Sequence, residues 1–216
     1  LRFGIALDAP PEGWRLGNPN AAKAVMAELV AGASVRVALP PSVPDGTYPP
    51  QGGRGDEPGA WLRNSTLPFA EDGAVTLTVT DQVHEAGELE LVYHPATLML
   101  GRGCERGCDP AEAIALAEKA LSENGLAAES VAAVASLDLK ADEAAIHAVA
   151  DHFGVLARFF DAARLEAETP RLANPSDIVF AEVGCHGVAE GAALASVGPD
   201  GELAVAKIKS KRATVA

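Results

Sequence analysis

The 216-residue sequence predicts an α/β fold in two units: a small α/β unit over residues 1–95 and a three-layer α/β domain with a mixed sheet over residues 96–216. Two observations lead to this fold class. Strand-type and helix-type segments alternate through the second part, a pattern typical of helices that cover both faces of a sheet. Hydrophobic residues make up 48% of the chain and aromatic residues only 5%, so we expect a core of small aliphatic side chains.

The first unit is predicted to contain one helix and three strands. Residues 18–32 form the helix, with Asn18 as its N-cap and Gly32 as its C-terminal stop. Strands are expected at 34–39, 74–80 and 89–94. Residues 40–60 are rich in Pro and Gly and nearly free of apolar side chains, which predicts a long loop.

The second unit is predicted to alternate strands and helices. Strands are expected at 97–100, 131–139, 155–160, 203–208 and 212–216. Helices are expected at 110–123, 142–154, 176–184 and 187–198. Asp109 is a candidate N-cap for the first of these helices, and Glu112 can reach back to the cap as in a capping box. The second helix shows its buried stripe at Ala145, Ile146, Val149, Ala150 and Phe153.

The first candidate binding element is the segment 98–113, LMLGRGCERGCDPAEA, where a strand gives way to a basic glycine loop and a helix. It contains Gly101, Arg102, Gly103, Cys104, Arg106 and Gly107. Glycines let the backbone approach a ligand, and a helix N-terminus favours negative charge. Arginines add charge-assisted hydrogen bonds to carboxylates or phosphates. A tight turn with solvated arginines explains the same residues equally well.

The second candidate element is the basic C-terminal segment AVAKIKSKRATVA. A strand period of two places Lys207, Lys209 and Lys211 on one face. Four basic residues without an acidic one are unusual in so acidic a chain. The alternative is an edge strand that its lysines protect from aggregation.

The third candidate element, SLDLKADE, follows the apolar strand 131–139 and contains Asp138, Lys140, Asp142 and Glu143. Ligands of open α/β sheets bind beyond the carboxyl ends of the strands, which is where these charges fall. An ordinary strand-to-helix turn with Asp142 as the cap is the alternative.

The remaining polar candidates are the cysteines and one glutamate. Cys104, Cys108, Cys185 and His186 have poor spacing for tetrahedral zinc, so we expect no metal. Buried structural thiols are the simpler interpretation of the cysteines. Glu190 is polar within an Ala-rich helix and is a candidate for a group that faces a site.

Charge and composition exclude several classes of function. The formal net charge is −13, whereas a nucleic-acid binder normally shows a basic field, so we expect no nucleic-acid partner. No apolar run approaches the roughly 20 residues that a membrane helix needs. The sequence shows no signal-peptide pattern, and three cysteines cannot all pair internally, so a reducing cytoplasm is expected.

Four motifs together resemble a known family. LMLGRGCERGCDPAEAI, VASLDLKADEAAI, GVAEGAALASVG and KIKSKRATVA occur in the order and spacing of the C-terminal domain of the CbiG/CobE family of cobalamin biosynthesis, across residues 97–216. Residues 12–95 resemble the central linker domain of the larger members more loosely. The N-terminal domain that precedes it in those members is not recognisable in this sequence.

The resemblance implies a cobalt-precorrin-5A hydrolase, which opens the δ-lactone of its substrate and releases acetaldehyde. The alternative is a non-catalytic module of the aerobic pathway that binds a precorrin or docks a partner. That partner would be a precorrin methyltransferase or a separate polypeptide with the N-terminal domain. No cofactor is implied.

The resemblance also implies roles for the candidate residues, because precorrins carry many acetate and propionate side chains. Carboxylate contacts are expected from Arg102, Arg106, Lys140, Lys207 and Lys209, with Asp138 beside them. The backbone of Gly101, Gly103, Cys104 and Gly107 is expected to approach the ring edge and supply amide donors for an oxyanion. Glu190 or Asp142 is the expected general base for the attacking water.

Overall fold

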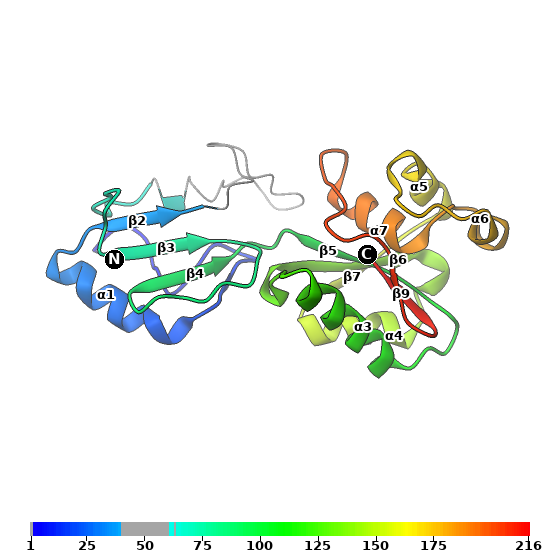
Figure 1. Ribbon diagram of the computed structural model, residues 1–216, viewed down its shortest axis with the longest axis horizontal. Helices are drawn as coiled ribbons and strands as arrows, with labels where there is room; N and C mark the ends of the chain where they lie inside the picture. Colours follow the sequence, from blue (N-terminus) through cyan, green and yellow to red (C-terminus); the bar gives the residue numbers. More distant parts are fainter. Residues whose placement is uncertain (1, 40–60, 63) are drawn as a thin grey trace. The chain divides into compact units, whose positions relative to one another are not determined.

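A computed structural model describes residues 2–39, 61–62 and 64–216, which form two compact units, residues 1–97 and 98–216 (Figure 1). The α/β fold class is confirmed, since each unit combines helices with a mixed sheet. The loop predicted at 40–60 lies outside the described residues. That the first unit is of the linker type stays a prediction.

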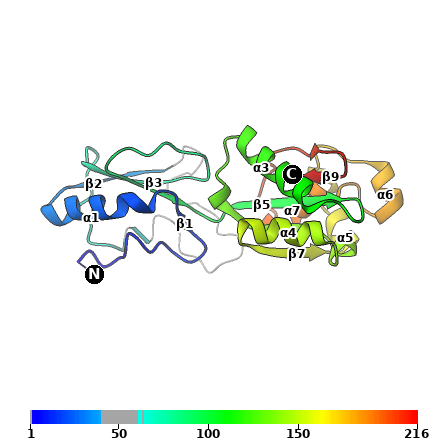
Figure 2. The same cartoon turned by 90° about the horizontal axis from the view of Figure 1, so that it is seen from below.

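In the first unit, a four-stranded sheet of order β1-β4-β3-β2 is covered by helix α1 (Figures 1 and 2). The elements are β1 (Arg15–Leu16), α1 (Ala22–Ala31), β2 (Val35–Ala38), β3 (Val75–Val79) and β4 (Glu90–His94). Gly32 ends α1 with φ at 107°, as predicted. Asn18 does not cap the helix, because its side-chain amide instead bonds to the backbone of Glu90 and Val92 in β4.

In the second unit, a five-stranded mixed sheet has the order β7-β6-β5-β9-β8. Its strands are β5 (Leu98–Cys104), β6 (Val131–Leu137), β7 (Leu156–Phe160), β8 (Ile208–Lys209) and β9 (Ala213–Val215). The first three are parallel, whereas β9 runs antiparallel to β5, and β8 antiparallel to β9. The C-terminal hairpin therefore extends the sheet beside β5.

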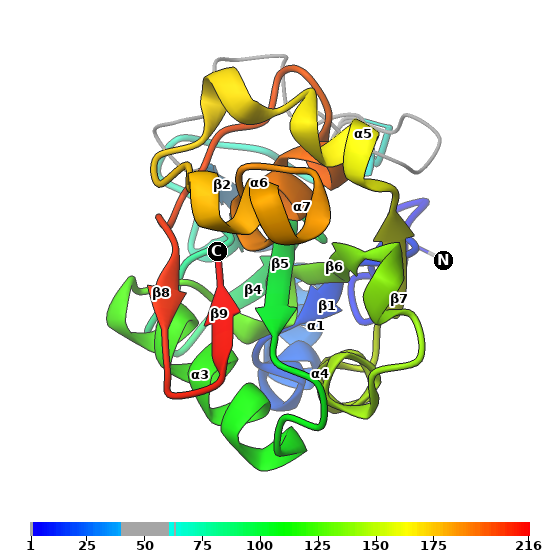
Figure 3. The ribbon, with the colours of Figure 1, turned by 90° about the vertical axis from the view of Figure 1, so that its right-hand side faces the viewer.

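Helices cover both faces of this sheet, which gives the three predicted layers (Figure 3). On one face lie α3 (Pro110–Glu123) and α4 (Ala144–Phe153). On the other lie α5 (Ala162–Glu166), α6 (Asp177–Val183) and α7 (Val188–Val197). Single 3-10 turns occur at Pro19–Ala21, Ala128–Ser130, Asp138–Lys140 and Thr169–Arg171. All five predicted stripe residues of α4 are buried, and Asp109 caps α3 by accepting a hydrogen bond from the amide of Ala111.

The structure differs from the sequence prediction in several segments, among them the two-residue strand β1, which was not predicted. Residues 101–104 continue strand β5 instead of starting a loop, because they pair with β9. Residues 203–207 form no strand, so the predicted strand there shrinks to the two residues of β8. Helix α5 was not predicted, because five residues are too few to show a helical period.

Helix α7 packs closely on β5 because Gly101 has no side chain. A Cβ atom at this position would lie 1.9 Å from the carbonyl oxygen of Ala189 in α7.

No single helix in the described ranges is long and apolar enough to cross a membrane. The pair α6 and α7 passes such a test only by combined length and composition, and is bent by 78°.

We predict that Gly101→Ala destabilises the second unit, since the new methyl group has to push α7 away from the sheet. The free energy of unfolding should fall by about 1–3 kcal/mol or more in urea titration. Gly125→Asn is the control, because Gly125 has φ at 66° and open space around it, and Asn tolerates that conformation. Equal stability of Gly101→Ala and the wild type would show that α7 is not in close contact with the strand.

Candidate functional site

A pocket of about 380 Å³ opens in the second unit at the end of β5, next to the N-terminus of α7, the helix α6 and the C-terminal hairpin. Its basic residues are Lys140, Lys207, Lys209, Lys211 and Arg212. Its apolar residues are Leu137, Val179, Val183, Val188, Ala189 and Ala213. Gly103, Cys104, Glu105, Glu182, Gly187, Ser210 and Thr214 complete the lining. We call this site the lysine pocket.

The glycines of β5 bring the pocket walls close to the strand. Gly101 lies beneath α7, so its missing side chain serves helix packing and not a ligand. Gly103 does line the pocket, and a Cβ atom there would lie 2.7 Å from Oγ1 of Thr214. At both glycines the close neighbour is another part of the chain, and approach of the Gly103 backbone to a ligand stays a prediction.

The lysines of the pocket form no ion pair with a carboxylate among the described residues. The charges of Lys140, Lys207 and Lys211 nevertheless interact with those of Asp142, Glu190 and Glu112 respectively. Lys207 donates from Nζ to the backbone carbonyl of Asn174, and Lys140, Lys209 and Lys211 make no ion pair in the described ranges. Gly187 provides no capping side chain at the N-terminus of α7, whose dipole adds positive potential. The pocket thus concentrates positive charge in a chain of net charge −13.

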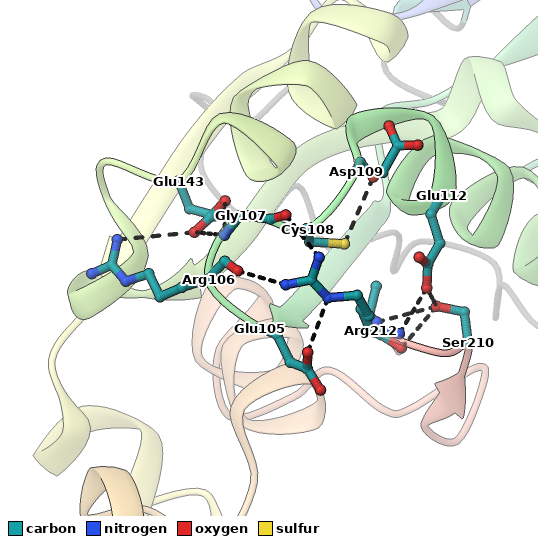
Figure 4. A network of polar contacts seen from close by, with 10 residues as sticks. Glu105, Arg106, Gly107, Cys108, Asp109, Glu112, Glu143, Ser210 and Arg212 are labelled. Atoms are coloured by element: carbon teal, nitrogen blue, oxygen red, sulfur yellow. Dashed lines mark hydrogen bonds and ion pairs between the residues drawn. The ribbon is translucent and has the colours of Figure 1, made fainter.

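The loop 105–109 is closed by contacts within the protein (Figure 4). Arg212 donates to the side chain of Glu105 and to the carbonyls of Arg106 and Gly107. The amide of Gly107 is 3.1 Å from Oε1 of Glu143. The amides of Gly101 and Glu105 bond to the backbone of Ala216 and Arg212 respectively. These amide groups are therefore occupied, which argues against the predicted oxyanion donors at Gly101 and Gly107.

Arg102 does not reach the lysine pocket. Its side chain is fully buried, and Nη2 donates to the carbonyl of Ala113 in α3 at 2.7 Å. Nε and Nη1 have no partner among the described residues, and burial lowers the pKa of this guanidinium to about 10. The predicted carboxylate contact is corrected accordingly: Arg102 alternates with Gly101 and Gly103 along β5 and points to the opposite face.

Arg106, Asp138 and Asp142 also lie outside the lysine pocket lining. Arg106 forms an ion pair with Asp142 and donates to the carbonyl of Leu139, so both predicted charges are paired with each other. The hydrogen bond from Arg106 lowers the pKa of Asp142, which makes this carboxylate a weaker base. Asp138 is exposed at the start of the 3-10 turn after β6.

Glu190 is buried in α7, with 1% of its surface exposed, and is not among the residues that line the lysine pocket. Its carboxylate accepts hydrogen bonds from the amide of Asn174 at 2.9 Å, the Nδ2 of Asn174 at 2.8 Å and the amide of Lys207 at 2.9 Å. Burial by itself would raise the pKa of Glu190, but these hydrogen bonds outweigh it and lower the pKa. An occupied carboxylate of low pKa does not suit the predicted role of base.

The three cysteines lie on opposite faces of the sheet. Cys108 is buried in the core under α3 and α4, against which Cys104 packs, and Cys185 is buried in the core under α7. Cys104 also lines the lysine pocket, and burial raises the pKa of its thiol. Within the described ranges, no group of three or more His, Cys, Asp or Glu is placed to hold a metal ion.

Sequence reasoning selected Gly103, Cys104, Lys140, Lys207 and Lys209, which the structure brings together. It missed the apolar wall from α6 and the carboxylate of Glu182, because nothing in the local pattern places α6 beside the hairpin. It also missed the pair of Glu166 and His186, whose Oε1 and Nδ1 atoms are 2.9 Å apart. Twenty positions separate these two residues, and no spacing rule connects them.

We predict that Glu190 stabilises the fold in a pH-dependent way. Its folded pKa lies below the value of about 4.3 expected in the unfolded chain, so its contribution is present above that pH and is lost as pH falls through the folded pKa. Glu190→Gln should therefore lower the free energy of unfolding by about 1–3 kcal/mol at pH 7, and by clearly less near pH 3. Urea titration of both proteins across this range measures the difference. A deficit that stays constant with pH would contradict the assignment.

Residues 98–216, more than half of the chain, match the family described as Cobalamin synthesis G C-terminus. A relative from Sinorhizobium sp, named Protein CobE, is 59% identical over 121 residues, which are 56% of this chain and 79% of that protein. A cobalt-precorrin-5A hydrolase from Priestia megaterium is 34% identical over 125 residues, which are 58% of this chain but only 33% of the hydrolase. A crystal structure of CobE, a protein from the cobalamin biosynthetic pathway, is 37% identical with a TM-score of 0.52, and covers 56% of this chain and 88% of that one.

Proposed function

Because this chain belongs to the Cobalamin synthesis G C-terminus family, we propose that its lysine pocket binds a corrinoid intermediate through the carboxylates of that intermediate. The process is cobalamin biosynthesis, and the resemblance inferred from the four sequence motifs is confirmed. The residues that line the pocket support both parts of this proposal, a corrinoid as the ligand and its carboxylates as the groups that enter the pocket.

The observation that carries the proposal is the group of four pocket lysines that form no ion pair in the described ranges: Lys140, Lys207, Lys209 and Lys211. Four ammonium groups around one pocket attract an anion, and Glu105 in the same lining is already paired with Arg212. Corrinoid intermediates carry acetate and propionate groups around an apolar ring. The lysines suit the carboxylates, and the apolar wall from α6 and α7 suits the ring edge.

The net charge of −13 repels an anionic ligand at long range. Exposed charges more than about 8–10 Å apart are largely screened at physiological ionic strength. The local lysines therefore dominate once the ligand is near the pocket. This balance makes affinity sensitive to salt and to each lysine.

A second candidate function is hydrolysis of the δ-lactone of cobalt-precorrin-5A, favoured by the likeness to the Priestia megaterium hydrolase over a third of that protein. In this reaction water attacks the lactone carbonyl, the ring C–O bond breaks, and acetaldehyde leaves afterwards. The predicted bases Asp142 and Glu190 are not in the pocket lining. Glu105 is paired with Arg212, so Glu182 is the pocket carboxylate without an ion pair or hydrogen bond in the described ranges. We propose Glu182 as the base if this chain is catalytic.

We predict that the pocket distinguishes cobyrinic acid, a corrin with free carboxylates, from its fully methylated ester. The acid should bind more tightly, and the double variant Lys209→Gln/Lys211→Gln should weaken acid binding about tenfold, roughly 1.4 kcal/mol for two exposed contacts. Titration of the corrin absorption band at low and high salt measures both. The matched control is Lys23→Gln/Lys119→Gln, which removes the same charge outside the pocket. Equal weakening by both double variants would show that the pocket lysines have no special role.

We predict further that a catalytic chain releases one acetaldehyde per cobalt-precorrin-5A consumed, without a second polypeptide. Glu182→Gln should then lose about 100-fold or more in rate while the substrate still binds. A coupled alcohol-dehydrogenase assay detects the product, and Glu123→Gln on the exposed end of α3 is the control. Tight substrate binding by the wild type without acetaldehyde would leave corrinoid binding as the function and exclude hydrolysis by this chain alone.

A further inference from the structure

The lysine-bearing segment 207–212 is held at both ends by carboxylates that bind its backbone. At the first end, Oε1 of Glu190 accepts the amide of Lys207 at 2.9 Å. At the second end, Oε1 of Glu112 accepts the amide of Arg212 at 2.7 Å and Oγ–H of Ser210 at 2.6 Å (Figure 4). Glu112 belongs to α3 and Glu190 to α7, so the segment is fixed to helices on both faces of the sheet.

The contact at Glu190 extends to a second segment of the chain. Its carboxylate accepts both the amide and the Nδ2 group of Asn174, and the carbonyl of Asn174 accepts Nζ of Lys207 at 2.9 Å. Glu190, Asn174 and Lys207 thus form a closed set of hydrogen bonds. The set fixes the backbone of Lys207 and also the direction of its ammonium group at the pocket.

The choice of partner matters for the charge of the pocket. In a chain with many more acidic than basic residues, a lysine is expected to form an ion pair with a carboxylate. Here Glu190 and Glu112 accept hydrogen bonds from amides and a hydroxyl. Glu105 pairs with Arg212, and the pocket ammonium groups form no ion pair in the described ranges. A carboxylate buried as deeply as Glu190 is stable only where hydrogen-bond donors surround it. The amide of Lys207 therefore stabilises Glu190, and Glu190 in turn holds the segment.

We propose that Glu190 and Glu112 are positioning residues, which hold the backbone of segment 207–212 so that its lysines face an anionic ligand in the pocket. This inference rests on the proposed binding of a corrinoid carboxylate there. It replaces the role of general base for Glu190 and gives Glu112, expected to close a capping box, a different task.

The test uses the sign of the effect on binding. Removing a negative charge near lysines should by itself tighten the binding of an anion. If Glu190 positions Lys207, Glu190→Gln should instead weaken the binding of cobyrinic acid about three- to tenfold, because the ammonium group is no longer fixed. Binding of the fully methylated ester should change less than twofold. Glu123→Gln makes the same charge change on the surface of α3 and should not weaken binding of the acid.

A double-mutant cycle separates positioning from general loss of structure. Lys207→Gln should weaken binding of the acid, and adding Glu190→Gln should cause no further loss, since Glu190 acts through Lys207. Equal loss for the acid and the ester, or additive losses in the cycle, would overturn the inference. So would full affinity of Glu190→Gln for the acid.

Two further results distinguish failure of the positioning role from failure of the proposed corrinoid binding. If the wild type does not bind cobyrinic acid, the proposed function fails, whatever the variants do. If Glu190→Gln does not fold, judged by its thermal unfolding, the same comparison is made with Glu112→Gln at the exposed end of the segment. Unchanged acid binding by folded Glu112→Gln would then overturn the positioning role.

Discussion

The second unit depends on how closely helix α7 approaches strand β5. A side chain at Gly101 would occupy the place of the carbonyl oxygen of Ala189, so the helix lies directly against the strand. This contact fixes the N-terminus of α7 at the end of β5, where the lysine pocket opens. It also places Glu190 where its carboxylate meets the amide of Lys207. Gly101 therefore contributes to the site through helix packing. Gly103 is the glycine of this strand that lines the pocket.

The electrostatic arrangement follows from this packing. Arg212 and Glu143 bind backbone groups of loop 105–109, and Glu190 and Glu112 bind the amides at the two ends of segment 207–212. Glu112, Glu143 and Glu190 thus accept hydrogen bonds from backbone amides, whereas the pocket lysines form no ion pair in the described ranges. The lysine pocket is in this way locally cationic in a chain whose net charge is −13.

Features set by neighbouring residues were predictable from the sequence. The cap at Asp109, the ends of helices at Gly184 and Gly198, and the buried stripe of α4 follow local rules and agree with the structure. Features set by distant partners were not. Glu112 matches a capping box by spacing, but its partner Ser210 lies 98 positions away. The glycine loop matches an anion site by composition, but β9 converts its first half into a strand. Glu190 was selected because it is polar within an Ala-rich helix, but its expected role was that of a base facing a site. No local pattern predicts its hydrogen-bond donors at 174 and 207.

Lysine acetylation with and without cobyrinic acid, quantified by mass spectrometry, tests the central claim most directly, because it needs no substitution. Bound carboxylates should shield ammonium groups from the reagent. We expect cobyrinic acid to protect Lys140, Lys207, Lys209 and Lys211, while Lys23 in α1 and Lys119 in α3 react as before. Its methylated ester should protect them less. Protection of Lys23 or Lys119 equal to that of the four pocket lysines, or no protection at saturating ligand, would contradict the account.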